Sequence, residues 1–294
     1  MRRALVLSGG GSVGIAWQSG LAAGLRRGGV DLMAADQIVG TSAGSAVGAQ
    51  LALGRDPEDQ LARYRRAEPQ PPAPSTASGA MAERMARFMA IMAEVADASP
   101  QERRARIGQF ALEADAMAEE EFVALFSYLK GEPWPRRFSC TAVDAATGVF
   151  QVWDELSGVE LDRAVASSCA VPGLFSPVTI AGRRYMDGGM RSGTNADLAA
   201  GCDRVLVVSL LDPSRLPAGD PRAARYLETT QAELAGLADA GAAVQVLAPD
   251  DAAAAVLGVN LMDASRAPAA ALEGLRQGQE AAGQLGPFWH PGSD

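Results

Sequence analysis

Two glycine-rich segments near the start of the chain hold the residues whose types and spacing could do chemistry. Residues 40–44 (GTSAG) form a GxSxG pattern, which follows a short apolar run and precedes a stretch of small residues. This arrangement suits a nucleophilic serine, because a serine on a sharp strand-to-helix turn needs small neighbours. Its hydroxyl would attack an acyl carbonyl and form an acyl-serine. Residues 10–14 also fit the pattern, so Ser12 competes with Ser42 for this role.

The other segment, residues 9–14 (GGGSVG), predicts backbone amides gathered at a helix N-terminus. Such amides bind an anion, either the pyrophosphate of a dinucleotide or the oxyanion of acyl transfer. The glycines fit the GxGxxG dinucleotide pattern, which requires an acidic residue at the end of the second strand. The apolar run 37–39 ends instead on glycine, and Asp31 and Asp36 precede it. These residues alone do not decide between the pyrophosphate and the oxyanion.

A nucleophilic serine needs a base, and the chain has a single histidine, His290. It lies in residues 289–294 (WHPGSD), which we interpret as a frayed tail. A carboxylate is the alternative, and Asp187 follows the predicted strand 183–186 directly. The two glycines after Asp187 leave a carboxylate accessible and permit a close turn, although an ordinary Asp-Gly turn has the same composition.

The ordered set GGGSVG at 9–14, GTSAG at 40–44 and DGG at 187–189 resembles the patatin-like phospholipase family, as does the stretch 166–177 (ASSCAVPGLFSP). The resemblance covers roughly residues 4–210, apart from a helical insertion. It implies Ser42 as nucleophile and Asp187 as proton acceptor. The oxyanion hole that it implies consists of the amides of Gly9, Gly10 and Gly11. The supporting glycines of the motifs are Gly40, Gly44, Gly188 and Gly189.

One position departs from the family pattern. The family commonly has a basic residue just before the last glycine of its first motif, and this chain has Val13 there. The backbone amides survive that change. A role for the missing cation, in steadying the loop or in meeting an anionic headgroup, is thereby put in doubt.

We therefore predict a serine acyl hydrolase that cleaves carboxylic ester bonds of lipids through a Ser42–Asp187 dyad. Water activated by the same carboxylate would release the acid, and no metal or organic cofactor is implied. The predicted partner is a lipid or acyl-ester substrate. Three alternatives stay open: a dinucleotide-binding protein, a non-catalytic regulator with the same fold, and acyl transfer to an acceptor other than water.

Composition limits the partners and the location. The net charge of −9 argues against nucleic acid, which needs a basic surface, and against tight electrostatic docking on an anionic membrane. Transient hydrophobic contact with a membrane surface is compatible with this negative charge. Three widely spaced cysteines, Cys140, Cys169 and Cys202, form no disulfide framework and favour a reducing cytoplasm. No run of apolar residues approaches the length of a membrane span.

Apolar runs that alternate with helical stretches predict an α/β fold with a mostly parallel central sheet covered by helices. The resemblance makes this a three-layer α/β/α domain over residues 1–294, with a helical, lid-like insertion at about 66–131. The insertion begins with the proline-rich segment 68–79 and carries an apolar stripe at helical spacing. That stripe consists of Met81, Met85, Phe88, Met89 and Met92. It either packs into the core or forms a pliable wall for acyl chains.

Overall fold

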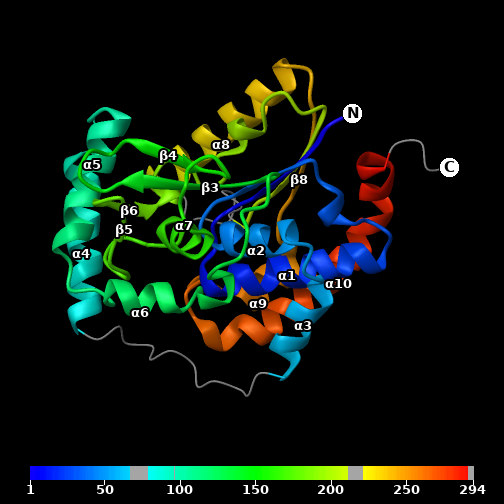
Figure 1. Ribbon diagram of the computed structural model, residues 1–294, viewed down its shortest axis with the longest axis horizontal. Coiled ribbons are helices and arrows are strands. Elements are labelled where there is room, and N and C mark those ends of the chain that lie inside the picture. Colours follow the sequence, from blue (N-terminus) through cyan, green and yellow to red (C-terminus); the bar gives the residue numbers. More distant parts are fainter. Residues whose placement is uncertain (67–78, 96, 211–220, 291–294) are drawn as a thin grey trace. The chain divides into compact units, whose positions relative to one another are not determined.

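The computed structural model describes residues 1–66, 79–95, 97–210 and 221–290 (Figure 1). By its internal contacts the chain divides into two compact units. The first consists of Met1–Ala73 with Gly193–Asp294, and the second of Pro74–Ser192. Each unit is described in turn.

The first unit is built on a parallel sheet in the order β2-β1-β7-β8. Its strands are β1 (Arg3–Leu7), β2 (Gln37–Gly40), β7 (Arg204–Val208) and β8 (Ala243–Leu247). The α-helices are α1 (Gly11–Arg27), α2 (Ala43–Ala52), α3 (Pro57–Arg66), α8 (Pro221–Asp239), α9 (Asp251–Leu257) and α10 (Ala267–Trp289). Short 3-10 helices are η1 (Leu32–Ala34), η4 (Ala196–Ala199) and η6 (Ala264–Arg266).

Helices cover both faces of this sheet because successive side chains of a strand point to opposite faces. One face packs Val6, Val39 and Val205 against η4 and against Leu237 of α8. The opposite face carries Leu7, against which α2 packs at Gly44. A sheet between two helical layers is the arrangement of α/β proteins.

Helix α1 is buried because α2, α3 and α10 all contact it. Helix α10 runs alongside it in the same direction (Figure 1). Glycines let the two backbones almost touch: a Cβ at Gly24 would overlap the carbonyl of Leu275, and one at Gly274 would overlap the carbonyl of Trp17. The small residues along α1 are therefore required by helix packing.

The second unit contains an antiparallel sheet in the order β4-β3-β6-β5. Its strands are β3 (Phe138–Asp144), β4 (Phe150–Trp153), β5 (Val178–Ile180) and β6 (Arg183–Asp187). The α-helices are α4 (Gly79–Glu94), α5 (Pro100–Glu113), α6 (Glu119–Ala124) and α7 (Leu161–Ser168). Its 3-10 helices are η2 (Ser127–Leu129) and η3 (Gly188–Met190).

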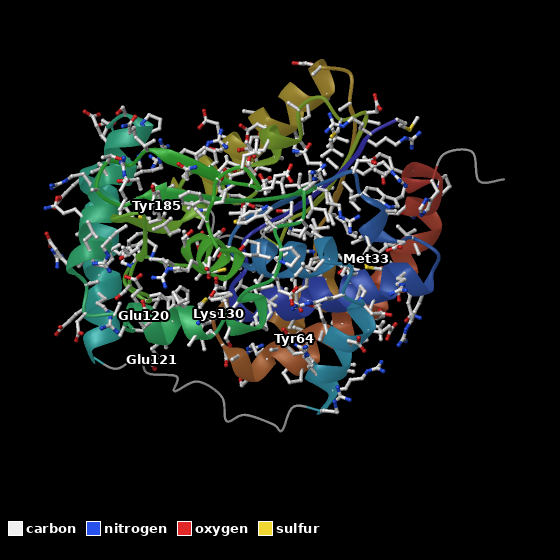
Figure 2. All side chains as sticks on the ribbon, viewed as in Figure 1. Met33, Tyr64, Glu120, Glu121, Lys130 and Tyr185 are labelled. Carbon is white, nitrogen blue, oxygen red and sulfur yellow. The ribbon has the colours of Figure 1, made fainter. Side chains whose placement is uncertain are left out.

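The two faces of the antiparallel sheet carry different cores. Val143 and Met186 face α5, where they pack with Ile107 and Ala111. Tyr185, labelled in Figure 2, lies edge-on to Trp153 with ring centroids 4.8 Å apart. The sheet is thus fixed from both faces, and β6 holds Asp187 at its end.

The predicted mixed α/β fold, with a mostly parallel sheet flanked by helices, is confirmed. Two details differ. The apolar spacing of the sequence predicts a helix over 15–27, whereas α1 begins at Gly11, inside the glycine segment. The apolar run 243–247 predicts a buried strand, whereas β8 pairs with β7 on one side only among the described strands, and Val246 is 48% exposed.

The described elements of the insertion at about 66–131 are the helices α4, α5, α6 and η2, which are joined by turns and by an isolated bridge between Met117 and Phe175. Most of the proline-rich segment 68–79 lies outside the described residues, and so do the side chains of Met81, Met85, Met89 and Met92. Phe88, the remaining member of the stripe, packs against the core of the second unit. The single-domain boundary and the lid-like role stay predictions.

Candidate active site

Ser42 occupies a sharp turn between strand β2 and helix α2. Its backbone angles are φ 52° and ψ −121°, a conformation that costs a non-glycine residue about 1–3 kcal/mol. The Ser42 carbonyl accepts hydrogen bonds from the amide of Ser45 at 2.8 Å and from its hydroxyl at 2.6 Å. The strained turn is therefore held from the α2 side. Such a turn exposes a serine Oγ at the end of a sheet.

Both glycines of the GTSAG motif are required by close backbone approach. A Cβ at Gly40 would meet the backbone of Gly44 and Ser45, and a Cβ at Gly44 would overlap the carbonyl of Leu7 in β1. Ser12, by contrast, lies in the first turn of α1 and has no left-handed backbone conformation. Of the two GxSxG matches, only residues 40–44 have the strained strand-to-helix turn that a nucleophile elbow requires.

The glycine segment connects β1 to α1 beside Ser42. A Cβ at Gly9 would lie 3.5 Å from Ser42 Cβ and 4.0 Å from its Oγ. Gly11 has φ +60°, and a Cβ there would approach the Leu261 carbonyl oxygen within 2.5 Å. The loop therefore passes next to the serine at Gly9, and glycine is needed at Gly11, where the chain is left-handed and close to Leu261.

The three amides of this loop differ in what they bind. The Gly9 amide donates to the Gly193 carbonyl at 3.0 Å, so in this conformation it is not available to an oxyanion. No described residue accepts a hydrogen bond from the amides of Gly10 or Gly11, which stand at the N-terminus of α1. Of the predicted set Gly9, Gly10 and Gly11, the amides of Gly10 and Gly11 therefore have capacity for an anion in this conformation, and the oxyanion hole itself stays a prediction.

A loop from the C-terminal part of the chain steadies the glycine segment at its other end. The Val13 amide donates to the Leu261 carbonyl at 3.0 Å, and the Ser12 hydroxyl approaches the same oxygen at 3.4 Å. Val13 itself is fully buried. The position where the family commonly has a cation is thus part of the core in this protein.

Behind the elbow lies a buried polar network that the sequence analysis missed. Asn195 donates from its side chain to the Thr41 hydroxyl at 2.9 Å, and Thr41 immediately precedes Ser42. Glu233 of α8 accepts from the Thr194 hydroxyl at 2.6 Å and from the Ala196 amide at 2.9 Å. No pattern in the sequence links Glu233 to Thr194 and Ala196, which lie 39 and 37 positions earlier, or through Asn195 to Thr41.

Asp187 ends strand β6 in the second unit and is 3% exposed. Its amide donates to the carbonyl of Ala170 at 3.0 Å, and its Oδ1 accepts from the amide of Gly189 at 2.7 Å. Ala170 belongs to the stretch 166–177 that the sequence analysis singled out. That stretch therefore fixes the backbone of the carboxylate.

Glycine is required at the two positions after Asp187 for different reasons. A Cβ at Gly188 would overlap Thr141 of β3, and a Cβ at Gly189 would come within 3.0 Å of the Asp187 carboxylate. Gly188 permits the close turn, and Gly189 leaves the carboxylate unobstructed. The structure brings Ser42 and the glycine segment together within the first unit. Asp187 is described within the second, and its pairing with Ser42 is a proposal.

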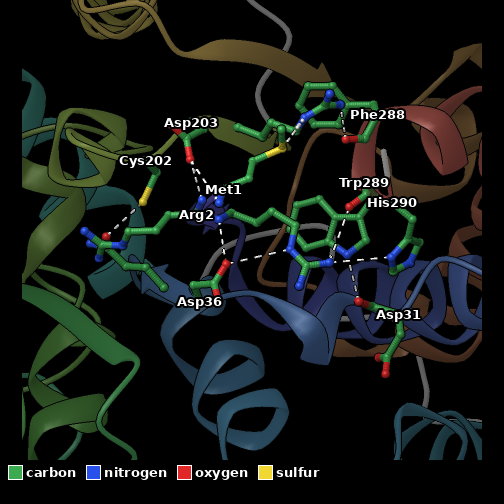
Figure 3. Close-up of polar contacts among 12 residues, drawn as sticks. Met1, Arg2, Asp31, Asp36, Cys202, Asp203, Phe288, Trp289 and His290 are labelled. Atoms are coloured by element: carbon green, nitrogen blue, oxygen red, sulfur yellow. Dashed lines mark hydrogen bonds and ion pairs between the residues drawn. The ribbon is translucent and has the colours of Figure 1, made fainter. Parts of the chain in front are cut away.

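His290 lies at the opposite edge of the parallel sheet from Ser42. It follows Trp289, the last residue of α10, and its Nδ1 is 3.5 Å from a guanidinium nitrogen of Arg3, at the start of β1 (Figure 3). Trp289 is fully buried and donates from its indole to the carbonyl of Asp31 at 2.8 Å. The interpretation of this segment as a frayed tail is wrong for Trp289 and His290, and residues 291–294 lie outside the described residues.

The carboxylates considered for a dinucleotide ribose lie at that same edge. Asp36 accepts from the amide of Arg3 at 2.7 Å (Figure 3). Asp31 accepts from the amide of Met33 at 2.9 Å. A carboxylate that binds the ribose of a dinucleotide would lie at the carboxyl end of the second strand, and β2 ends there on Gly40. Within the described ranges, no cluster of three or more His, Cys, Asp or Glu side chains is arranged for a metal ion. No described helix is long and apolar enough to cross a bilayer.

Comparison with known proteins identifies the family. No curated protein matches the chain. Among solved structures, VipD from Legionella pneumophila is similar at 15% identity and a TM-score of 0.42, over 96% of this chain and 67% of VipD. The type III effector protein ExoU gives the same identity and TM-score over 96% of this chain and 53% of its own length. The sequence profile of patatin-like phospholipases matches residues 5–200, and the chain belongs to the patatin-like phospholipase family.

Proposed function

We propose that the protein is a serine acyl hydrolase that cleaves carboxylic ester bonds of lipids, with Ser42 as nucleophile and Asp187 as general base. The single observation that carries this proposal is the strained Ser42 elbow beside the glycine segment. Family membership supports lipid hydrolysis at the coarser level.

In the first step Asp187 accepts the proton of the Ser42 hydroxyl while Oγ attacks the ester carbonyl. The carbonyl oxygen becomes an oxyanion, and the amides of Gly10 and Gly11 donate to it. One such donor is worth about 3–4 kcal/mol in the transition state. The tetrahedral intermediate collapses when the C–O bond to the alcohol breaks, and the proton on Asp187 passes to the departing oxygen.

In the second step water attacks the acyl-serine. Asp187 accepts a proton from that water, and the same two amides stabilise the second oxyanion. Collapse returns the proton to Ser42 Oγ and releases the carboxylic acid. Free aspartate is a weak base, with a pKa of about 3.9, so the carboxylate must act through alignment and desolvation. The 3% exposure of Asp187 supports this role.

The test is active-site labelling with a fluorophosphonate, followed by hydrolysis of p-nitrophenyl esters of increasing chain length. The Ser42→Ala variant should lose both labelling and turnover. The matched control is Ser12→Ala, which removes a serine from the other GxSxG match and should keep labelling. Labelling that survives Ser42→Ala and disappears in Ser12→Ala would overturn the assignment.

Two further outcomes separate the alternatives. A folded wild-type protein that is neither labelled nor active would be a non-catalytic regulator with the patatin fold. A protein that is labelled but transfers its acyl group to added alcohols faster than to water would be an acyltransferase.

A further inference from the structure

A four-residue segment, 193–196, contacts both parts of the proposed reaction centre in the first unit. At its start, the Gly193 carbonyl accepts the amide of Gly9, the first residue of the glycine segment. Two residues later, Asn195 donates to the hydroxyl of Thr41, next to Ser42. The position of this segment therefore fixes the glycine segment and the elbow together.

The backbone conformation of residues 193–196 is constrained by its surroundings. Asn195 is fully buried and adopts a left-handed conformation, with φ 50° and ψ 40°. A Cβ at Gly193 would overlap the ring of Tyr226 on α8, so that ring packs directly against the backbone. A left-handed conformation costs a non-glycine residue about 1–3 kcal/mol, and it persists where the surrounding structure holds it.

Glu233 supplies that support. It is 8% exposed, and its Oε2 accepts from the Thr194 hydroxyl at 2.6 Å and from the Ala196 amide at 2.9 Å. These two donors flank Asn195 on either side. One buried carboxylate oxygen thus holds the backbone before and after the residue that contacts the elbow. Glu233 lies beyond residue 200, where the match to the family profile ends.

We propose that Glu233 is a positioning residue that sets the distance between the Ser42 hydroxyl and the oxyanion amides. It does not touch the substrate. It acts through residues 193–196 on Gly9 from one end and on Thr41 from the other. The inference rests on the proposed function for its kinetic consequence, but the structural coupling can be measured without turnover.

The Glu233→Ala variant removes the acceptor that the Thr194 hydroxyl and the Ala196 amide share, and the loss of a buried acceptor is costly. The segment then shifts, and the oxyanion amides move relative to Ser42 Oγ. Because these amides act mainly on the charge of the transition state, kcat should fall about tenfold or more while KM stays within about twofold. The rate of fluorophosphonate labelling should fall with kcat.

Two further variants separate positioning from a general loss of stability. Glu233→Gln keeps a carbonyl oxygen of the same reach, which can accept from both donors, and should restore kcat to within about threefold of wild type. Gln277→Ala is the matched control: Gln277 is 6% exposed, lies in the same unit, and donates to the backbone carbonyl of Ala248 at 2.6 Å. It should lower the melting temperature and leave kcat unchanged.

Hydrogen exchange provides the readout that does not depend on activity. Glu233→Ala should raise amide exchange in peptides covering residues 8–14 and 40–45, and Gln277→Ala should not. If the protein proves inactive, this exchange pattern still supports the coupling while the proposed function fails alone. The proposal is overturned if exchange in these peptides is unchanged in folded Glu233→Ala. It is also overturned in an active enzyme if kcat is unchanged, or if Gln277→Ala lowers kcat equally.

Discussion

The strongest test of a histidine-free mechanism is replacement of the single histidine, His290, by alanine. Helix α10 ends at the preceding residue, Trp289, and α1 begins beside Ser42. The two helices run together, with Gly28 at the end of α1 against Ala282 of α10. Since α1 rises about 1.5 Å per residue over its length, the imidazole lies on the order of 20 Å from the glycine segment.

The expected energetic effect is small. The substitution removes a side-chain contact with Arg3 that is 3.5 Å long, at the limit of hydrogen bonding. The amide of residue 290 still donates to the Gly286 carbonyl, which accepts it at 2.8 Å. We expect a loss of about 0.5 kcal/mol or less and a fall in melting temperature of about 2 °C or less. The value of kcat/KM should stay within about twofold of wild type.

The assay compares ester hydrolysis and fluorophosphonate labelling in His290→Ala and Asp187→Asn. The asparagine keeps the shape of the side chain but cannot accept the proton, so kcat should fall by about 10²–10⁴. Substitution is preferred to truncation, because removal of Trp289 would leave a cavity where a fully buried indole packs. A His290→Ala protein that melts cooperatively and is as inactive as Asp187→Asn would refute the dyad.

The remaining predictions concern the elbow, the glycine segment, a buried carboxylate and the insertion. Gly44→Ala should abolish labelling and lower the melting temperature, since its Cβ would overlap a carbonyl of β1. Val13→Arg should lower the free energy of unfolding by about 3–5 kcal/mol in denaturant titrations, because Val13 is fully buried. It should not raise the rate of ester hydrolysis. Burial raises the pKa of Asp144, but hydrogen bonds from Arg183 and Thr147 outweigh this effect and hold the pKa below its ordinary value. Asp144→Asn should therefore cost about 1–2 kcal/mol at pH 7 in urea titrations. The difference should narrow as the pH falls below about 4, because the carboxylate is protonated there in the unfolded chain and at still lower pH in the folded protein. Polar substitution of Met85 and Met89 should slow turnover of long-chain esters more than of acetate esters; an equal loss in both, together with a lower melting temperature, would make the stripe ordinary core.

The elements that carry the motifs could be predicted because their signals are local. A strand that ends on Gly40 and a helix of small residues after Ser42 leave few other structures for the segment between them. Close approach explains the same glycines that the pattern singled out, as with Gly44 against Leu7. Motif spacing therefore encodes the geometry of the turn itself.

The state of the Gly9 amide could not be predicted in this way. Whether an amide is free depends on its partner, and this partner is the carbonyl of Gly193, 184 residues away in the sequence. The burial of Trp289 has the same origin, because its indole donates to the carbonyl of Asp31. Contacts between distant segments leave no periodicity or composition signal in either segment.

The support of the glycine segment shows how the family's basic residue can be absent here. A cation at position 13 would need solvent or a carboxylate, but this position is core and its amide is held by the Leu261 carbonyl. The opposite end of the segment is held by Gly193. Backbone hydrogen bonds at both ends constrain the direction of the Gly10 and Gly11 amides without any charge. A loop held in this way provides no cation for an anionic headgroup, so any preference for phospholipid over neutral ester has to come from residues other than position 13.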